Sequence, residues 1–169
     1  MKRLLLVTAI AAAGLLGVGG PAQADPPPLH SGSFVLTGTA TAGTDGFCPF
    51  DVRLDYVTHQ RTTETTNADG AIVDYSTGAA TATVTNTSSG KSLTYNISGP
   101  GTLTTYPDHS FTEDNMGPFL LFTTVANSYP GVPALAYTTG HVQLAVAASQ
   151  LTTSYRLQGH STDVCAALG

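Results

Sequence analysis

The sequence predicts an all-β fold, built as an antiparallel meander of about ten short strands. Short segments alternate apolar and polar residues, as strands with one buried face do; in residues 50–56, Phe50, Val52, Leu54 and Tyr56 share one side. Turn sequences such as Asn67-Ala68-Asp69-Gly70 separate these segments. No segment after residue 24 has the spacing of an amphipathic helix, and residues 166–168 are too short to count as one. Because the connections are short, neighbouring strands must run antiparallel.

The predicted strands follow one another with only one long irregular connection, residues 125–133, which carries Tyr129-Pro130-Gly131. Residues 119–122 form the one fully apolar segment, which we expect to be central or buried on both faces. A turn at Thr139-Gly140 is expected to separate two of the later strands. The strands are expected at residues 34–39, 50–56 with a continuation to 66, 71–75, 78–86, 92–98, 102–106, 110–113, 119–122, 134–138, 141–148 and 151–158.

Closure of this meander into a barrel, complete or nearly so, is the expected architecture. An open sheet of so many strands would leave two long edges unpaired, and closure removes them. A bond between Cys48 and Cys165 would bring the first and last strands together. A two-sheet β-sandwich is the alternative, because the same bond could cross between sheets. The row of side chains expected to face the interior is Leu93, Tyr95, Ile97, Val142, Leu144 and Val146.

The N-terminal residues have the features of an export signal. Met1-Lys2-Arg3 is positively charged, residues 4–18 are apolar, and Ala22-Gln23-Ala24 is a small-x-small cleavage motif. We therefore expect a signal peptide over residues 1–24, a Pro-rich leader over 25–32, a single β domain over 33–169, and a secreted protein with no integral membrane association after cleavage.

After cleavage the chain would be acidic. Four basic side chains would remain against eleven acidic ones, a formal charge of −7. Repulsion from phosphate excludes nucleic acid as an expected partner. The four basic residues are Arg53, Arg61, Lys91 and Arg156.

The two cysteines of an exported chain most simply form one disulfide, Cys48–Cys165. A free catalytic thiol and an intermolecular bridge are the alternatives. A nucleophilic cysteine needs a histidine and an electropositive setting, whereas Cys48 lies between Phe47 and Pro49 in an acidic chain. The bond would close a loop of 165 − 48 = 117 residues, and we expect Phe47 and Phe50 to cover it.

No pattern of catalytic, metal-binding or cofactor-binding residues stands out, so we expect no catalytic residue, metal or cofactor. His160, Ser161 and Asp163 lie close together, but positions 160 and 163 of a strand face opposite sides, and a turn in which Asp163 holds backbone amides fits better. The two glutamates, Glu64 and Glu113, lack the apolar local setting that a glycosidase acid needs. The chain has no Trp, and a sugar-stacking platform would have to use Tyr106, Tyr129 and Tyr137.

The segments Gly46-Phe47-Cys48-Pro49-Phe50-Asp51-Val52 and Asp163-Val164-Cys165-Ala166-Ala167-Leu168 resemble those of a group of small exported proteins from high-GC Gram-positive bacteria. The central Ala82-Thr83-Val84-Thr85-Asn86 is similar as well. The resemblance implies an all-β exported domain with one disulfide. The group has no established activity, so the resemblance implies no catalytic or binding residue.

Three functions are open to such a chain. The first is a non-enzymatic barrel that binds a small apolar ligand or a cell-envelope component. The second is an extracellular protein-interaction or structural module that acts through residues 125–133. The third, and weakest, is a hydrolase built on His160, Asp163 and a serine.

Overall fold

The computed structural model describes residues 27–36 and 46–169, and in this part of the chain the fold is all-β and antiparallel, as predicted. The predicted signal peptide lies outside the described residues, as do residues 25 and 26 of the leader and residues 37–39 of the first expected strand. No helix among the described residues is long and apolar enough to cross a membrane. The elements are β1 (His30–Leu36), β2 (Val52–Thr66), β3 (Ile72–Asn86), β4 (Ser92–Asn96), β5 (Gly101–Thr105), β6 (Phe111–Met116), β7 (Phe119–Phe122), β8 (Leu135–Val146), β9 (Thr152–Asp163) and α1 (Val164–Leu168).

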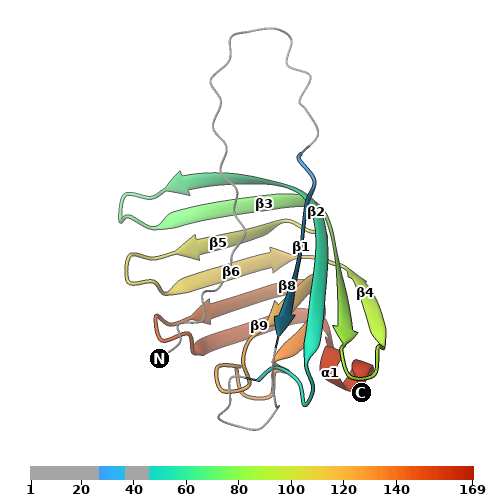
Figure 1. Ribbon diagram of the computed structural model, residues 1–169. Helices are drawn as coiled ribbons and strands as arrows, with labels where there is room; N and C mark the ends of the chain where they lie inside the picture. Colours follow the sequence, from blue (N-terminus) through green and yellow to red (C-terminus); the bar gives the residue numbers. More distant parts are fainter. Residues whose placement is uncertain (1–26, 37–45) are drawn as a thin grey trace, which may run out of the picture.

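Two long strands of the sheet change partners along their length. The first part of β3 pairs with β5, and its last part pairs with β4. Likewise β8 pairs first with β7 and then with β6, while β9 runs beside both parts. One end of the molecule is therefore a six-stranded sheet in the order β2-β3-β5-β6-β8-β9, which we call the six-stranded end (Figure 1). At the other end, β1, β4 and the adjoining parts of β2 and β3 turn away from that sheet; we call it the disulfide end.

Glycines within strands stand at the boundary between these ends. Gly78 in β3 and Gly140 in β8 have φ of +137° and +107°, a conformation that L side chains rarely adopt. A Cβ at Gly140 would also collide with the carbonyl oxygen of Gln158 on β9. The predicted turn at Thr139-Gly140 is wrong, because Gly140 bends the strand without leaving the ladder: it stays paired with Gly159.

The predicted barrel is not closed. Among the described strands, no pairing joins β1 to β7 or β4 to β9, so the sheet keeps its edges. The physical reason is that the two cysteines do not lie on the edge strands: Cys48 lies in the irregular segment before β2, and Cys165 lies in α1. The disulfide forms as predicted, with a Cα–Cα distance of 5.4 Å, but it ties two chain segments together across a core. It is consistent with an extracellular or otherwise oxidising compartment.

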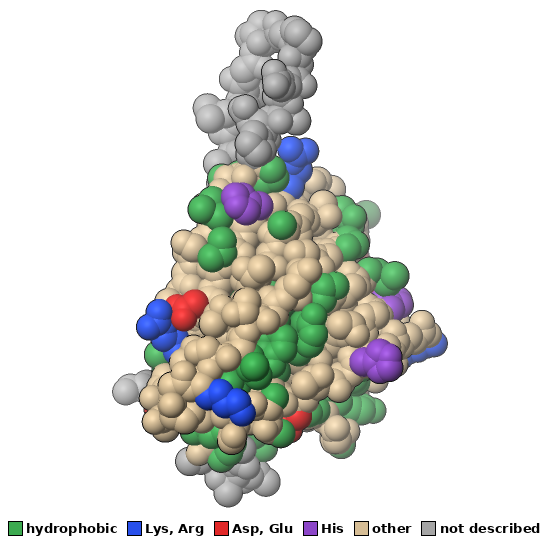
Figure 2. Space-filling model, turned by 90° about the vertical axis from the view of Figure 1, so that its right-hand side faces the viewer, with side chains coloured by type: hydrophobic (Ala, Val, Ile, Leu, Met, Phe, Trp, Pro, Cys, Tyr) green, Lys and Arg blue, Asp and Glu red, His purple; other side chains and the backbone are tan. Residues whose placement is uncertain are grey.

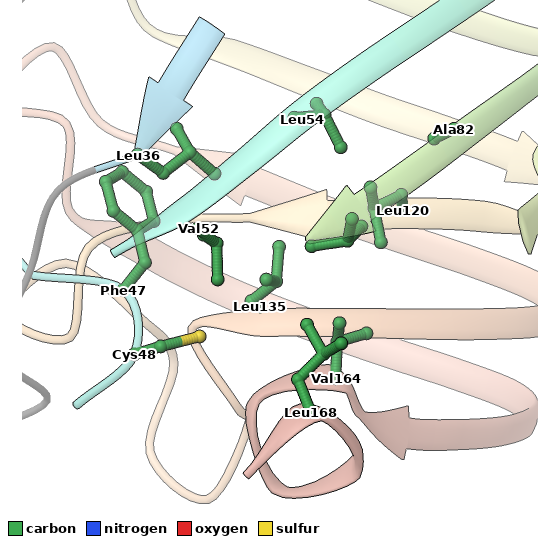
Figure 3. Packing of buried hydrophobic residues seen from close by; sticks show 11 residues of the cluster. Leu36, Phe47, Cys48, Val52, Leu54, Ala82, Leu120, Leu135, Val164 and Leu168 are labelled. Carbon is green, nitrogen blue, oxygen red and sulfur yellow. The ribbon is translucent and has the colours of Figure 1, made fainter. Parts of the chain in front are cut away.

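Apolar side chains from several strands and from α1 converge in the core of the disulfide end (Figure 3). Val52 from β2, Leu135 from β8, and Val164 and Leu168 from α1 are all fully buried. Phe47 and Cys48 belong to this first apolar cluster, and Phe50 and Cys165 pack against it. The Phe47 ring is directed toward Leu36 (Figure 3), so the expectation that Phe47 covers the disulfide stays a prediction. Val164–Leu168 is a short helix, contrary to our expectation. Asp163 makes it possible, because its carboxylate accepts a hydrogen bond from the Ala166 N–H at 3.0 Å and so caps the first turn.

A second apolar cluster follows β8 from its pairing with β7 into the six-stranded end, where β8 pairs with β6. It contains Leu121, Ala136 and Leu144, whereas the neighbouring Leu120 and Leu135 belong to the first cluster. The apolar segment β7 is therefore packed on both faces, as one form of the prediction had it, although it ends the path of paired strands and is not central.

Candidate functional site

The connection from β7 to β8 is irregular, as predicted, and hydrogen bonds fix it both to the segment before β2 and to the start of β9. The Val125 N–H donates to the carbonyl of Gly46 at 2.8 Å, and the Thr152 N–H donates to the carbonyl of Asn127 at 2.9 Å. At the tip, the Val132 N–H donates to the carbonyl of Tyr129 at 2.9 Å. We call residues 123–134 the β7–β8 loop; it is long, but it is anchored at several points.

The tip of the β7–β8 loop is a turn that its sequence favours. Pro130 and Gly131 occupy the two central positions, and Gly131 has a φ of +80°. Proline at the first central position and a residue with positive φ at the second are the requirements of a type II turn. The turn places the Tyr129 ring 6.3 Å from the ring of Tyr155 on β9. The loop tip is thus held against the outer strand of the sheet.

Two open grooves flank this loop. The larger, of about 500 Å³, lies beside the disulfide, and most of its lining is apolar. The smaller, of about 310 Å³, lies against β9, where Tyr155, Leu157 and Ser161 line it. Val132, Pro133 and Asp163 line both grooves. The larger groove is lined by Phe47, Pro49, Phe50, Val125, Ser128, Val132, Pro133, Ala134, Asp163, Cys165, Ala166 and Gly169.

The proposed catalytic group of His160, Ser161 and Asp163 does not come together. All three lie in β9, where alternation puts His160 on the opposite side from the other two. Ser161 and Asp163 line the smaller groove, but Asp163 is engaged in capping α1, as the sequence predicted for this turn. His160 is exposed and has no side-chain partner in the described part of the chain. The geometry therefore gives no nucleophile, base and orienting acid at this place.

A different histidine and aspartate do meet. The His141 Nε2 and Asp114 Oδ1 atoms lie 2.8 Å apart, and Gln143 donates to the other carboxylate oxygen at 2.7 Å. These hydrogen bonds from Gln143 and, secondarily, from His141 lower the pKa of Asp114. The pair is separated by 27 residues in the chain and is created by the pairing of β6 with β8, so only the strand register could have revealed it. It lies on an exposed sheet surface beside Arg156 on β9, away from both grooves.

Glu113 has an apolar setting that the local sequence did not show. Its direct cross-strand partners are Leu103 on β5 and Leu144 on β8. Burial raises the pKa of Glu113, while a hydrogen bond from Asn115 at 3.1 Å opposes that rise. Glu64 lies three strands away across the sheet, roughly 14 Å at ordinary strand spacing. This exceeds the 6.5–9.5 Å or so that the carboxyl pair of an inverting glycosidase needs.

The three tyrosines of the expected sugar-stacking platform do not come together, and neither do the six side chains of the expected interior row. Tyr137 packs against Tyr95, with ring centroids 4.6 Å apart, whereas Tyr129 contacts Tyr155 and Tyr106 lies at the turn after β5. Leu93, Tyr95 and Ile97 pack against the first cluster, while Val142, Leu144 and Val146 belong to the second. The two halves of the row thus belong to separate clusters and line no common interior.

The surface on the side of β2 and β4 is poor in charge (Figure 2). Apolar side chains form a diagonal stripe across it, within a surface that is mostly uncharged and polar. No three histidine, cysteine, aspartate or glutamate side chains converge into a metal-binding group in the described part of the chain. Binding through apolar and hydrogen-bonding contacts is therefore the chemistry that these surfaces offer.

Comparisons with protein-family models, with curated proteins and with solved structures gave no match. The resemblance to the small exported proteins of high-GC Gram-positive bacteria stays a prediction.

Proposed function

We propose that the protein is an exported, non-enzymatic interaction module that holds an apolar segment of an extracellular or cell-envelope protein in the larger groove. The observation that carries the proposal is the groove itself. It is open, about 500 Å³ in volume and mostly apolar, and it is built on the anchored β7–β8 loop and the disulfide. Loops that a rigid scaffold positions are the usual carriers of binding function. A groove whose walls are already fixed also loses little conformational entropy on binding.

Export enters this proposal through the N-terminal sequence and the disulfide. The apolar run followed by Ala22-Gln23-Ala24 has the features of a signal peptide, and the Cys48–Cys165 bond suits an oxidising compartment. A secreted chain of formal charge −7 would meet proteins of the extracellular space and the cell envelope.

A small apolar ligand is the second candidate, because both groove volumes fall within or near the range of about 300–1,000 Å³ typical of ligand sites. It ranks lower because both sites are open grooves, and the core beneath them is filled by Leu135, Leu168 and Val52 at 0% exposure. A barrel interior that encloses the ligand, as the sequence suggested, has no support in this arrangement.

Site-specific photocrosslinking tests the proposal. A photoreactive phenylalanine replaces Val132 in the groove wall or, as a control, Val57, which is 44% exposed on β2 outside both grooves. We expect the residue 132 probe to give a covalent adduct with a defined protein of the culture medium or cell envelope, and the residue 57 probe to give none. Phe50→Asp should abolish that adduct, since it places a charge in the apolar wall. Identical adducts at both positions, or none at residue 132, would show that the groove does not bind such a partner.

A further inference from the structure

One row of cross-strand partners on the six-stranded end concentrates carboxylates. The row runs from β2 to β9 through directly opposed residues, which all project from the same face of the sheet. We call the face of the sheet from which this row projects the acidic face. The members of the row are Glu64, Asp74, Leu103, Glu113, Leu144 and Tyr155.

Glu64 and Asp74 are immediate neighbours in this row. Directly opposed residues of an antiparallel pair have Cβ atoms about 4.5–5.5 Å apart, and like charges at that position repel. Asp74 is only 6% exposed, and its Oδ1 atom is buried without a hydrogen-bond partner. Burial, and to a lesser extent the charge of Glu64, raises the pKa of Asp74. An ionised, buried carboxylate oxygen with no partner is costly, so the pair calls for a positive charge.

The sheet does not supply that charge. Arg61 on β2 and Arg156 on β9 project from the opposite face, since they alternate with Glu64 and Tyr155. His141 lies on that opposite face with Asp114. No basic side chain of these six strands projects from the acidic face in the part of the chain that the structure describes.

Two hydroxyl groups stand beside the carboxylate pair. Thr62 and Ser76 are the opposed residues of the next row on the same face, and their oxygens lie 2.7 Å apart. Four oxygen-bearing side chains thus come from two adjacent strands. Ca²⁺ binds oxygens at about 2.3–2.6 Å, so two of its ligands stand up to about 5 Å apart, which matches the separation of directly opposed side chains.

We propose that Glu64 and Asp74, with the hydroxyls of Thr62 and Ser76, bind a divalent cation, and that Ca²⁺ is the preferred one. The donors are all oxygen, which disfavours zinc and copper. The exposed Glu64 and the water around it suit the flexible six- to eight-fold shell of Ca²⁺ better than the strict octahedron of Mg²⁺. With two carboxylates only, the site belongs with weak extracellular sites, whose Kd values are about 10⁻⁴–10⁻³ M. A calcium-loop motif is absent from the sequence because these ligands come from two strands that only the fold brings together.

Thermal unfolding with calcium chloride as the probe tests this proposal. The purified protein is compared in 5 mM CaCl₂ and in EDTA, with ionic strength matched by NaCl. For a Kd near 0.5 mM, ligand linkage raises Tm by about 3–6 °C for a domain of this size. Calorimetric titration should show one binding site with a weaker response to MgCl₂.

Matched variants distinguish this site from general attraction to the acidic face. Asp74→Asn and Glu64→Gln should each abolish the calcium-dependent rise in Tm, whereas Glu113→Gln, on the same face two strands from Asp74, should keep it. In EDTA, Asp74→Asn should melt no lower than the parent chain, which shows that it is folded. A parent chain with no shift in CaCl₂ would overturn the proposal and leave a carboxyl pair that shares a proton. An equal shift in Asp74→Asn would overturn it too.

Discussion

The two ends of the sheet differ in the kind of side chain that their strands bring together. At the disulfide end, strands, loop and α1 surround an apolar cluster in which Leu135, Leu168 and Val52 are fully buried. At the six-stranded end, the edge strand β2 and its neighbour β3 carry Glu64 and Asp74, whose direct pairing has no apolar benefit. The two halves of β2 and β3 thus differ: residues of the first apolar cluster lie in one half, and the paired carboxylates lie in the other. Glycines at the boundary, Gly78 and Gly140 among them, let the ends differ in shape while the ladders continue.

Loss of the disulfide should have the largest effect on this contrast. The Cys48–Cys165 bond closes a loop with a sequence separation of 117 residues, for which the chain-entropy model gives roughly 4–5 kcal/mol of stabilisation. Cys48→Ser with Cys165→Ser should therefore lower Tm by on the order of 10 °C, as measured by calorimetry. Reduction of the parent chain should give a similar decrease. An unchanged Tm would mean that the apolar cluster alone holds this end together.

Truncation of matched leucines should separate the two ends next. Leu135 is fully buried in the first cluster, whereas Leu103 is only partly buried in the middle of the six-stranded end. Leu135→Ala should lower the free energy of unfolding by about 2–5 kcal/mol, because it leaves a cavity in a filled core. Leu103→Ala should cost about 1 kcal/mol, since less area leaves water when this side chain packs. Denaturant titration of both variants measures the difference, and equal losses would show that the partly buried Leu103 contributes as much to stability as Leu135 in the first cluster.

The difference between the ends marks how far the sequence alone could go. Alternation predicted which segments are strands and which residues share a face, and Asn67–Gly70 forms the predicted turn, with the Gly70 N–H bonded to the Asn67 carbonyl. The cysteine count predicted the disulfide, and turn residues predicted the irregular β7–β8 loop. Alternation and turn residues are local signals of backbone conformation. The disulfide could be predicted without knowledge of the fold because the chain has only two cysteines.

What the sequence could not show depends on register between strands. Gly140 looks like a turn residue, because the sequence does not reveal that Gly159 lies opposite and permits the close approach. The setting of Glu113 depends on which residues of β5 and β8 flank it, and the His141–Asp114 pair depends on the pairing of β6 with β8. The prediction of a closed barrel was wrong for the same reason. Alternation shows which face of a strand is buried, but it does not show which strands are neighbours.

The smallest expected effect comes from a pair of chain neighbours on opposite faces of the six-stranded end. The pKa of Glu113 is raised by burial, whereas hydrogen bonds from Gln143 and His141 lower the pKa of Asp114. Above the unfolded-state pKa of Glu113, about 4.3, the folded chain holds this proton more tightly, so stability from this group falls as pH rises through its folded pKa. Asp114 acts in the opposite sense, since its contribution is present above its unfolded pKa of about 3.9 and is lost as pH falls through its lower folded pKa.

Two substitutions convert this difference into a measurement of stability against pH. Glu113→Gln should remove part of the decline in the free energy of unfolding from about pH 4.3 upward. The substitution breaks no ion pair with its cross-strand neighbours, because Leu103 and Leu144 are apolar. Asp114→Asn should leave that range nearly unchanged and reduce the loss of stability below about pH 4, by less than about 1 kcal/mol, because exposed pairs are screened by solvent. Urea unfolding at intervals from pH 3 to 7 measures both curves. If the two variants changed the same pH range, burial of Glu113 would not be what distinguishes the two faces of the sheet.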